Sequence, residues 1–213
     1  MTNQHVLDTI AKCRVIPVVA IESVEAALPL ADALLAGGLP VIEVTFRTAA
    51  AADVIAVLSR ERPNLLVGAG TVLTPENLDA AIAAGARFGV APGFNPEVVR
   101  RARELGLPFV PGVCTPTDIE SALAAGCTTL KFFPAEACGG VAMVKALAAP
   151  YAHLGVRFVP TGGVSPSNLP DYLACPSVLA VGGTWLAKKE DIRDGAWSLI
   201  TDRCKVAMDV AGG

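Results

Sequence analysis

Residues 115–133 read TPTDIESALAAGCTTLKFF, and they combine the start of a helix, its end and a buried strand. Thr115 can accept a hydrogen bond from the first helical turn, and Pro116 stands at the first helical position, where a missing N–H does no harm. Gly126 follows the Ala-rich segment and can end the helix. The apolar run after it predicts a strand. Such a helix–strand unit is typical of alternating α/β proteins.

The same unit recurs along the chain. Apolar runs begin at intervals of roughly 20–29 residues and alternate with Ala-rich helical segments. Eight of them predict strands: Val15–Ile21, Val41–Phe46, Leu65–Thr71, Arg87–Pro92, Pro108–Val113, Thr128–Phe133, Arg157–Thr161 and Val178–Thr184. Ser23 is expected to cap a helix over Val24–Ala36, and Thr74 is expected to open the helix that ends at Ala84-Gly85. Pro17 and Pro160, inside expected strands, predict bulges or strand ends.

Eight strand–helix units without a linker predict one domain over residues 1–213, an α/β protein folded as a (β/α)8 TIM barrel. A helix at about residues 2–13 is expected to precede the barrel. The alternative is a doubly wound open sheet, although such sheets more often contain about five to seven strands.

The composition agrees with such a barrel and argues against several classes of protein. Of 213 residues, 53% are hydrophobic and 17% are charged, which is enough to bury one sizeable core. A net charge of -3 favours neither nucleic acid nor an anionic membrane as a partner. No stretch is long enough to span a membrane, and the N-terminus lacks the apolar core of a signal peptide. Six scattered cysteines without a CxxC pair indicate reduced thiols, so we expect a cytoplasmic protein.

Lys131 is the most unusual residue of the expected strands, because it lies within the apolar run Thr129–Ala135. Burial of an unpaired ammonium is costly and favours the neutral amine, which is a nucleophile toward carbonyl carbons. Lys131 therefore suggests Schiff-base chemistry. The alternative is a lysine at a strand end whose stem packs while its ammonium reaches water.

Glu43 holds the corresponding place on the second expected strand. Period-two alternation over Val41–Thr45 turns Glu43 into the barrel, and the same rule turns Lys131 inward. A buried carboxylate must be paired or functional, and the structural alternative is an ion pair with Arg47 or another base. An acid and an amine on different strands, both facing inward, predict a nucleophile with a proton shuttle.

Paired glycines stand at the ends of the last two expected strands, as Gly162-Gly163 and as Gly182-Gly183 before Thr184. TIM barrels often bind phosphate at this place, because bare backbone N–H groups and helix N-termini face the anion there. Glycine also serves any tight turn, which is the alternative for each pair.

Metal chemistry is not expected. His5 and His153 do not fall at strand ends, and no cluster of His, Asp and Glu could hold a divalent ion. Cys114 and Cys138 come near the expected mouth of the barrel but have no histidine partner, so we expect them to serve packing. The sequence therefore predicts no metal and no cofactor.

Five motifs in order along the chain resemble those of the 2-keto-3-deoxy-6-phosphogluconate (KDPG) aldolases. This family of class I aldolases also covers 4-hydroxy-2-oxoglutarate (KHG) aldolase, and the resemblance runs from about Ile16 to Trp185. The motifs are Glu43-Val44-Thr45-Phe46-Arg47, Gly68-Ala69-Gly70-Thr71-Val72, Pro92-Gly93-Phe94, Lys131-Phe132-Phe133-Pro134-Ala135-Glu136 and Thr161-Gly162-Gly163-Val164. The resemblance implies a (β/α)8 barrel and a homotrimer without metal.

The resemblance also implies a role for each matching residue. Lys131 would form the imine with the keto carbon of pyruvate, and Glu43 would act as acid and base, often through a water. The implied substrate contacts are Arg47 and Thr71 at the pyruvate carboxylate, Pro92 and Phe133 around it, Thr161 at a substrate hydroxyl, and Gly162, Gly163 and the residue at 184 at the phosphate. The family usually has serine at this last position, and Thr184 keeps the hydroxyl while adding a methyl group.

The implied activity is reversible cleavage of KDPG to pyruvate and D-glyceraldehyde 3-phosphate, a step of the Entner–Doudoroff pathway. The alternatives are KHG or the galactonate epimer of KDPG as substrate. Two glycine pairs favour a phosphorylated substrate, and the resemblance makes Thr161 favour the gluconate epimer, because galactonate-specific relatives tend to lack that hydroxyl. A non-catalytic phosphosugar-binding barrel would keep the glycine pairs but would need neither Lys131 nor Glu43.

Overall fold

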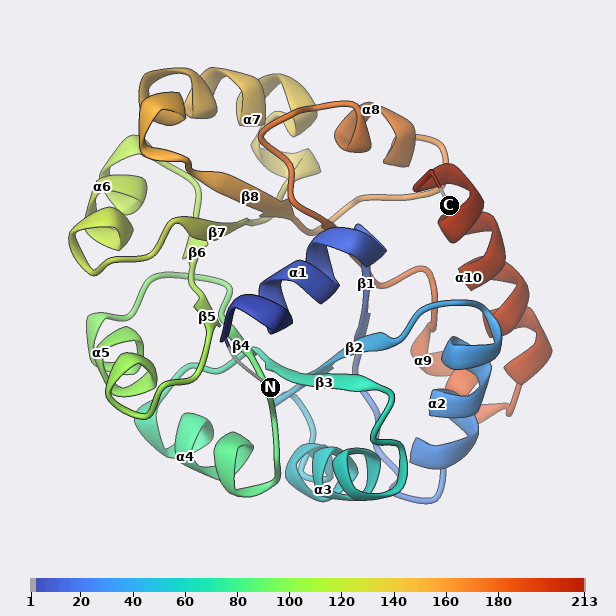
Figure 1. Ribbon diagram of the computed structural model, residues 1–213. Coiled ribbons are helices and arrows are strands. Elements are labelled where there is room, and N and C mark those ends of the chain that lie inside the picture. The colour runs from blue at the N-terminus through green and yellow to red at the C-terminus, as the bar shows by residue number, and fades with distance from the viewer. Residues whose placement is uncertain (1–2, 213) are drawn as a thin grey trace.

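The strands close into a parallel ring surrounded by helices in the computed structural model, which describes residues 3–212 (Figure 1). The strands are β1 Val15–Val19, β2 Val41–Thr45, β3 Leu66–Gly70, β4 Gly89–Val90, β5 Phe109–Val110, β6 Gly112–Val113, β7 Thr129–Phe132, β8 Arg157–Pro160 and β9 Val181–Gly183. The helices are α1 Asn3–Cys13, α2 Ala27–Ala36, α3 Ala51–Glu61, α4 Pro75–Ala83, α5 Pro96–Glu104, α6 Pro116–Ala124, α7 Gly140–Ala148, α8 Leu169–Leu173, α9 Lys189–Arg193 and α10 Trp197–Val210, with 3-10 turns η1 Glu136–Cys138 and η2 Ala149–Leu154.

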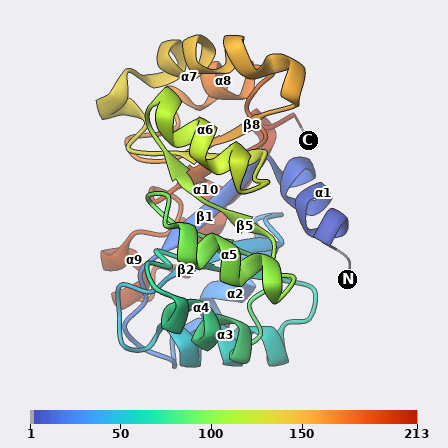
Figure 2. The same cartoon turned by 90° about the vertical axis from the view of Figure 1, so that its left-hand side faces the viewer.

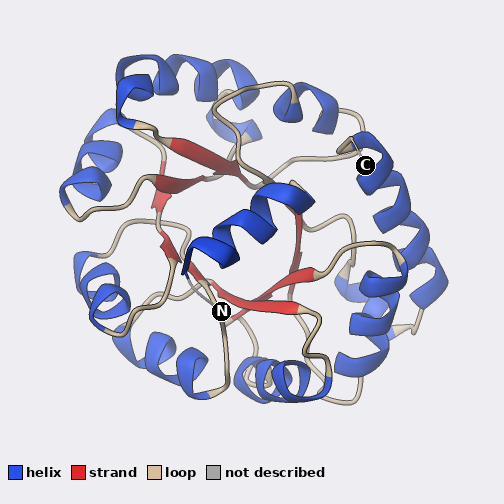
Figure 3. Ribbon diagram, viewed as in Figure 1, coloured by secondary structure: helices blue, strands red, loops and turns tan. Residues whose placement is uncertain are grey.

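The ring is a (β/α)8 TIM barrel, as the sequence predicts. One parallel run has the order β5-β4-β3-β2-β1-β9 and the other β6-β7-β8. Strands β5 and β6 continue one another across Pro111, which lacks an N–H, and bridges from Phe158 to Val178 and from Thr161 to Gly182 join β8 to β9. The chain therefore supplies eight strand positions, and helices cover the outside of the ring (Figure 3).

Helix α1 closes one end of the barrel. Its residues Val6 and Ile10 are buried, and Leu7 and Ile10 line the interior of the ring together with Phe88. Figure 2 shows α1 and α9 at opposite ends of the barrel. Access to the interior must therefore come from the end where α9 lies, which is the carboxyl end of the strands and the usual place for TIM-barrel chemistry.

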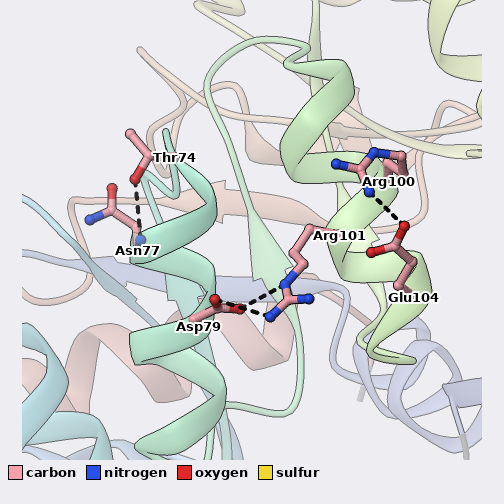
Figure 4. Close-up of polar contacts among 6 residues, drawn as sticks. All are labelled: Thr74, Asn77, Asp79, Arg100, Arg101 and Glu104. Carbon is pink, nitrogen blue, oxygen red and sulfur yellow. Dashed lines mark hydrogen bonds and ion pairs between the residues drawn. The ribbon is translucent and has the colours of Figure 1, made fainter.

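The expected helix starts are confirmed on the outer ring. Thr74 caps α4 by accepting a hydrogen bond from the Asn77 N–H, at 3.2 Å, and Thr115 forms a capping box at α6. Figure 4 shows the Thr74 cap. It also shows Arg101 on α5, whose guanidinium donates hydrogen bonds to both carboxylate oxygens of Asp79 on α4, at 3.1 and 3.2 Å. These exposed contacts fix the spacing of neighbouring helices more than they add stability.

Some local expectations are wrong. Ser23 does not cap a helix, because its hydroxyl donates to the Glu25 carboxylate at 2.6 Å and α2 begins only at Ala27. Pro160 is the last residue of β8, as expected, but Pro17 lies inside β1 and pairs in regular register with Gly183. A single missing N–H leaves the rest of a parallel ladder intact, so no bulge is needed there.

The N-terminal helix expected at about residues 2–13 corresponds to α1, and residue 2 lies outside the described residues. None of the described helices combines the length and the hydropathy that a membrane span requires.

Gly112 on β6 is a testable point of close packing. A Cβ atom there would stand 2.1 Å from the carbonyl carbon and oxygen of Pro92, which are backbone atoms and cannot swing away. Gly112→Ala should therefore destabilise the protein by at least about 2 kcal/mol, or lower the melting temperature by roughly 4–8 °C.

The matched control is Gly93→Ala, because Gly93 bonds to the Gly112 N–H through its carbonyl but has open space where a Cβ would stand. Thermal unfolding followed by circular dichroism compares the two variants. Equal melting temperatures would show that the contact between Gly112 and Pro92 is not a tight one.

Candidate active site

The barrel brings Glu43 and Lys131 together across its interior. Each is the third residue of its strand, Glu43 on β2 and Lys131 on β7, and both are buried, with side-chain exposures of 2% and 6%. The Lys131 Nζ lies 3.3 Å from the Glu43 Oε1, and 5.6 Å from the centre of the Phe133 ring. The inward orientation predicted for both residues is confirmed, and the base that pairs with Glu43 is Lys131, not the exposed Arg47.

Strand β3 makes room for the carboxylate. Gly70 pairs with Thr45, two residues after Glu43, and a Cβ at Gly70 would stand 2.2 Å from the Glu43 Oε1. Gly68, opposite Glu43 in the ladder, likewise leaves space for the Phe88 ring, because a Cβ at Gly68 would stand 2.2 Å from the Phe88 Cζ. The Gly68-Ala69-Gly70 sequence is therefore a packing requirement of the acid–amine pair and of the core behind it.

A buried ion pair of this kind is a poor source of stability. Two charges leave water, and apolar residues of similar volume often serve stability as well or better. The space beneath Glu43 is lined by apolar residues such as Ile10 and Phe88, and it encloses only about 10 Å³, which is at most one water. The arrangement therefore points to chemistry, because stability alone does not account for it.

Thr71 and Pro92 follow β3 and β4 at the mouth of the barrel, and both are half-buried. Thr71 has a φ of 54°, a left-handed backbone conformation that β-branched residues avoid and that costs on the order of 1–3 kcal/mol. Strain of this kind persists mostly where a side chain or N–H must face a ligand. The position of Thr71 is consistent with the substrate contact expected for it.

The expected phosphate residues divide into two groups. Gly162 and Gly163 follow β8 with φ values of 99° and 82°, which only glycine adopts readily, and Gly163 is exposed. Gly182 and Gly183 lie within β9, buried and paired with β1, so they stand at the end of the last strand, as expected, and do not form a turn after it. Their hydrogen atoms leave room for neighbouring side chains: a Cβ at Gly182 would stand 2.3 Å from the Thr161 hydroxyl.

A depression at the rim collects residues that the sequence does not connect. Arg47, Thr184 and Lys189 line it together with the ends of β1 and β2, and its volume is about 140 Å³. Arg47 and Thr184 are expected site residues, whereas Lys189, the first residue of α9, is not. No motif marks Lys189, and only its place shortly after the last strand could have suggested it.

The remaining expectations concern thiols, histidines and metal. The thiols of Cys114 and Cys138 contact each other, and this hydrogen bond, with partial burial, raises the pKa of Cys114 to about 11. His153 is exposed in η2. Among residues 6–212, whose side chains the structure describes, no group of three or more His, Cys, Asp and Glu side chains is arranged to hold a metal ion.

Comparison with known proteins decides the family. The sequence model of the family described as KDPG and KHG aldolase matches residues 6–203. The chain belongs to this aldolase family. The resemblance seen in the five motifs is thereby confirmed.

Relatives of this aldolase match it over nearly their whole length. The 2-dehydro-3-deoxy-phosphogluconate aldolase of Treponema pallidum (strain Nichols) is 48% identical over 207 residues, covering 97% of this chain and 98% of the relative. The KHG/KDPG aldolase of Escherichia coli (strain K12) is 43% identical over 197 residues, covering 92% of each. A crystal structure of KDPG aldolase from Legionella pneumophila, with pyruvate captured as a covalent carbinolamine, has a TM-score of 0.90 at 42% identity and covers 94% of this chain and 96% of that one.

Within this aldolase, the residues that the resemblance implies lie at one end of the barrel in three degrees of exposure. Buried are Glu43, Lys131 and Thr161; half-buried are Thr71, Pro92, Phe133 and Gly162; exposed are Arg47, Gly163 and Thr184. The exposure rises from the Lys131–Glu43 pair inside the barrel to polar groups at the rim, an arrangement that suits a long ligand with one end held at depth.

Proposed function

We propose that this protein is a class I aldolase that reversibly cleaves KDPG to pyruvate and D-glyceraldehyde 3-phosphate, the aldol step of the Entner–Doudoroff pathway. The observation that carries the proposal is the buried pair of Lys131 and Glu43, 3.3 Å apart in an otherwise apolar interior. The solved Legionella pneumophila relative, which holds pyruvate as a covalent carbinolamine, supports the same chemistry.

The reaction begins when Lys131 attacks the keto carbon of KDPG. Proton transfer from Lys131 to Glu43 across their contact leaves a neutral amine without leaving a lone charge in the interior. Addition gives a carbinolamine. Glu43 returns its proton to the carbinolamine hydroxyl, which leaves as water, so Glu43 is again a carboxylate and the protonated imine that remains is an electron sink.

Bond cleavage then uses Glu43 as a base. Its carboxylate takes the proton of the C4 hydroxyl as the C3–C4 bond breaks, the aldehyde product departs, and the bonding electrons form an enamine on Lys131. Glu43 later returns a proton to the enamine carbon, and water hydrolyses the imine to release pyruvate and restore the amine. Both residues must therefore reach neighbouring atoms of one substrate, which their contact allows.

The contacts to the rest of the substrate are those that the family resemblance implies. Thr71 and Arg47 hold the carboxylate of the pyruvate unit, and Pro92 and Phe133 shape the pocket around it. Gly162, Gly163 and Thr184 bind the phosphate, while Gly182 and Gly183 shape that end. The Thr161 hydroxyl, buried beside them, contacts a substrate hydroxyl.

Two other substrates use the same chemistry, namely KHG and the galactonate epimer of KDPG. The Thr184 hydroxyl and the Lys189 ammonium in one depression favour a phosphorylated substrate over KHG. Thr161 favours the gluconate epimer. A non-catalytic phosphosugar-binding barrel would have no use for the buried acid–amine pair. Assembly as a homotrimer belongs to the same proposal on the family resemblance, and a cytoplasmic location belongs to it on the scattered cysteines of the sequence.

Borohydride trapping tests the proposal directly. Reduction in the presence of pyruvate should add one pyruvate-derived mass, and peptide mapping should place it on Lys131. A coupled assay with lactate dehydrogenase should show a higher kcat/KM for KDPG than for its galactonate epimer or KHG. The control Lys131→Arg keeps a cation beside Glu43 but forms no stable imine, so it should lose both signals. A label on Lys12, Lys145, Lys188, Lys189 or Lys205 would refute the assignment.

Glu43→Gln tests the proton shuttle. Glutamine keeps the size and a hydrogen-bonding oxygen, so the variant should fold and still trap some pyruvate, while kcat for KDPG falls by about 10²-fold or more. Folding is checked by circular dichroism and kcat by the coupled assay. Turnover near that of the unmodified enzyme would assign proton transfer to another group.

The phosphate contact of Thr184 has a matched pair of variants. Thr184→Val keeps the shape but removes the hydroxyl, and a lost hydrogen bond to a charged group should raise the KM for KDPG by about 10-fold or more. Thr184→Ser keeps the hydroxyl and should stay within about twofold of the unmodified enzyme. Steady-state kinetics with KDPG and with its dephosphorylated analogue, 2-keto-3-deoxygluconate, make the comparison. An equal rise in KM for both substrates would remove Thr184 from the phosphate site.

A further inference from the structure

The proposed phosphate site has an electrostatic problem on its glycine side. Glu136 packs against Gly163, where a Cβ would stand 2.6 Å from the Glu136 Cβ, and the Tyr172 hydroxyl donates a hydrogen bond to the Glu136 carboxylate. The side chain nearest to the Gly162-Gly163 turn is thus an acid. Backbone N–H groups alone would have to hold a phosphate dianion beside it, so a cation must come from elsewhere.

The opposite side of the site supplies the cation. Thr184, the proposed phosphate ligand, lines the rim depression with Arg47 and Lys189. Arg47 follows β2, the strand that carries Glu43, and is assigned to the carboxylate end of the substrate. Lys189 begins α9, shortly after Thr184 on the same stretch of chain, and is the cation that remains for the phosphate.

Lys189 forms an exposed ion pair that is weak enough to break when a better partner binds. Its Nζ lies 2.7 Å from the Glu22 Oε1, and both side chains are well exposed, at 58% and 62%. Exposed ion pairs of this kind contribute only about 0–1 kcal/mol, because water and salt screen them. A phosphate dianion with a Thr184 hydroxyl beside it is a stronger partner for the ammonium than one exposed carboxylate.

We propose that Lys189 leaves its ion pair with Glu22 to bind the substrate phosphate, and that this exchange of partners favours phosphorylated 2-keto acids. Glu22 follows β1 and Lys189 follows β9, so their ion pair spans neighbouring strand ends at the rim of the mouth, at the end of the barrel opposite α1 (Figure 2). With the site empty, Glu22 keeps the Lys189 ammonium at the rim; with substrate bound, the ammonium turns to the phosphate. The inference rests on the proposed function.

The test compares Lys189→Ala with Lys188→Ala. Lys188 is the adjacent lysine, exposed like Lys189, but it lines a different groove, with Asp202 and Arg203. The measured quantity is the KM for KDPG divided by the KM for 2-keto-3-deoxygluconate, which lacks only the phosphate. Lys189→Ala should raise this ratio about fivefold, equivalent to about 1 kcal/mol, and Lys188→Ala should leave it unchanged. The difference should shrink in about 1 M salt, which screens exposed charges.

Glu22→Gln provides a second test, with an expected result that a purely structural role of Lys189 would not give. Removal of the competing carboxylate should lower the KM for KDPG, and the effect should vanish in the Lys189→Ala background. The inference is overturned if Lys189→Ala and Lys188→Ala give the same ratio, or if Lys189→Ala raises both KM values equally. If the unmodified enzyme neither cleaves KDPG nor traps pyruvate, the proposed function itself fails.

Discussion

The buried contact between Lys131 and Glu43 is the constraint on which the rest of the structure depends. A charged pair in an apolar interior destabilises the fold unless both partners meet in good geometry. That geometry requires β2 and β7 to place Glu43 and Lys131 in the same layer of the barrel interior. It also requires Gly70 to leave space where any side chain would collide with Glu43. The proposed function accounts for this cost, because it makes the pair a nucleophile and its proton acceptor.

The two ends of the barrel have different tasks. At one end α1 inserts Leu7 and Ile10 against the interior and seals the space under Glu43. At the other end, some of the residues that follow the strands have a left-handed backbone conformation, such as Thr71 and Gly162. Sealing one end excludes water from behind the reacting pair, so substrate can approach it from one direction only.

Charge is distributed along the site in a matching way. The interior pair is neutral as a whole, so it gains nothing from a distant anion. The rim carries Arg47 and Lys189, which line one depression with Thr184, and the proposed substrate is anionic at both ends. Glu136 accepts a hydrogen bond from Tyr172 on the glycine side, whereas the Thr184 side offers the Lys189 ammonium. Under the proposed function, this placement of charges on a rigid ring orients the substrate.

The sequence by itself determined the alternation of strands and helices, the caps at Thr74 and Thr115, and the inward parity of Lys131 and Glu43, because these depend on local periodicity and turn chemistry. Only the tertiary structure decided which base meets Glu43 and that Lys189 joins Thr184 at the rim. Those facts depend on register and closure between strands far apart in the chain, and no local pattern encodes the distance across a closed barrel.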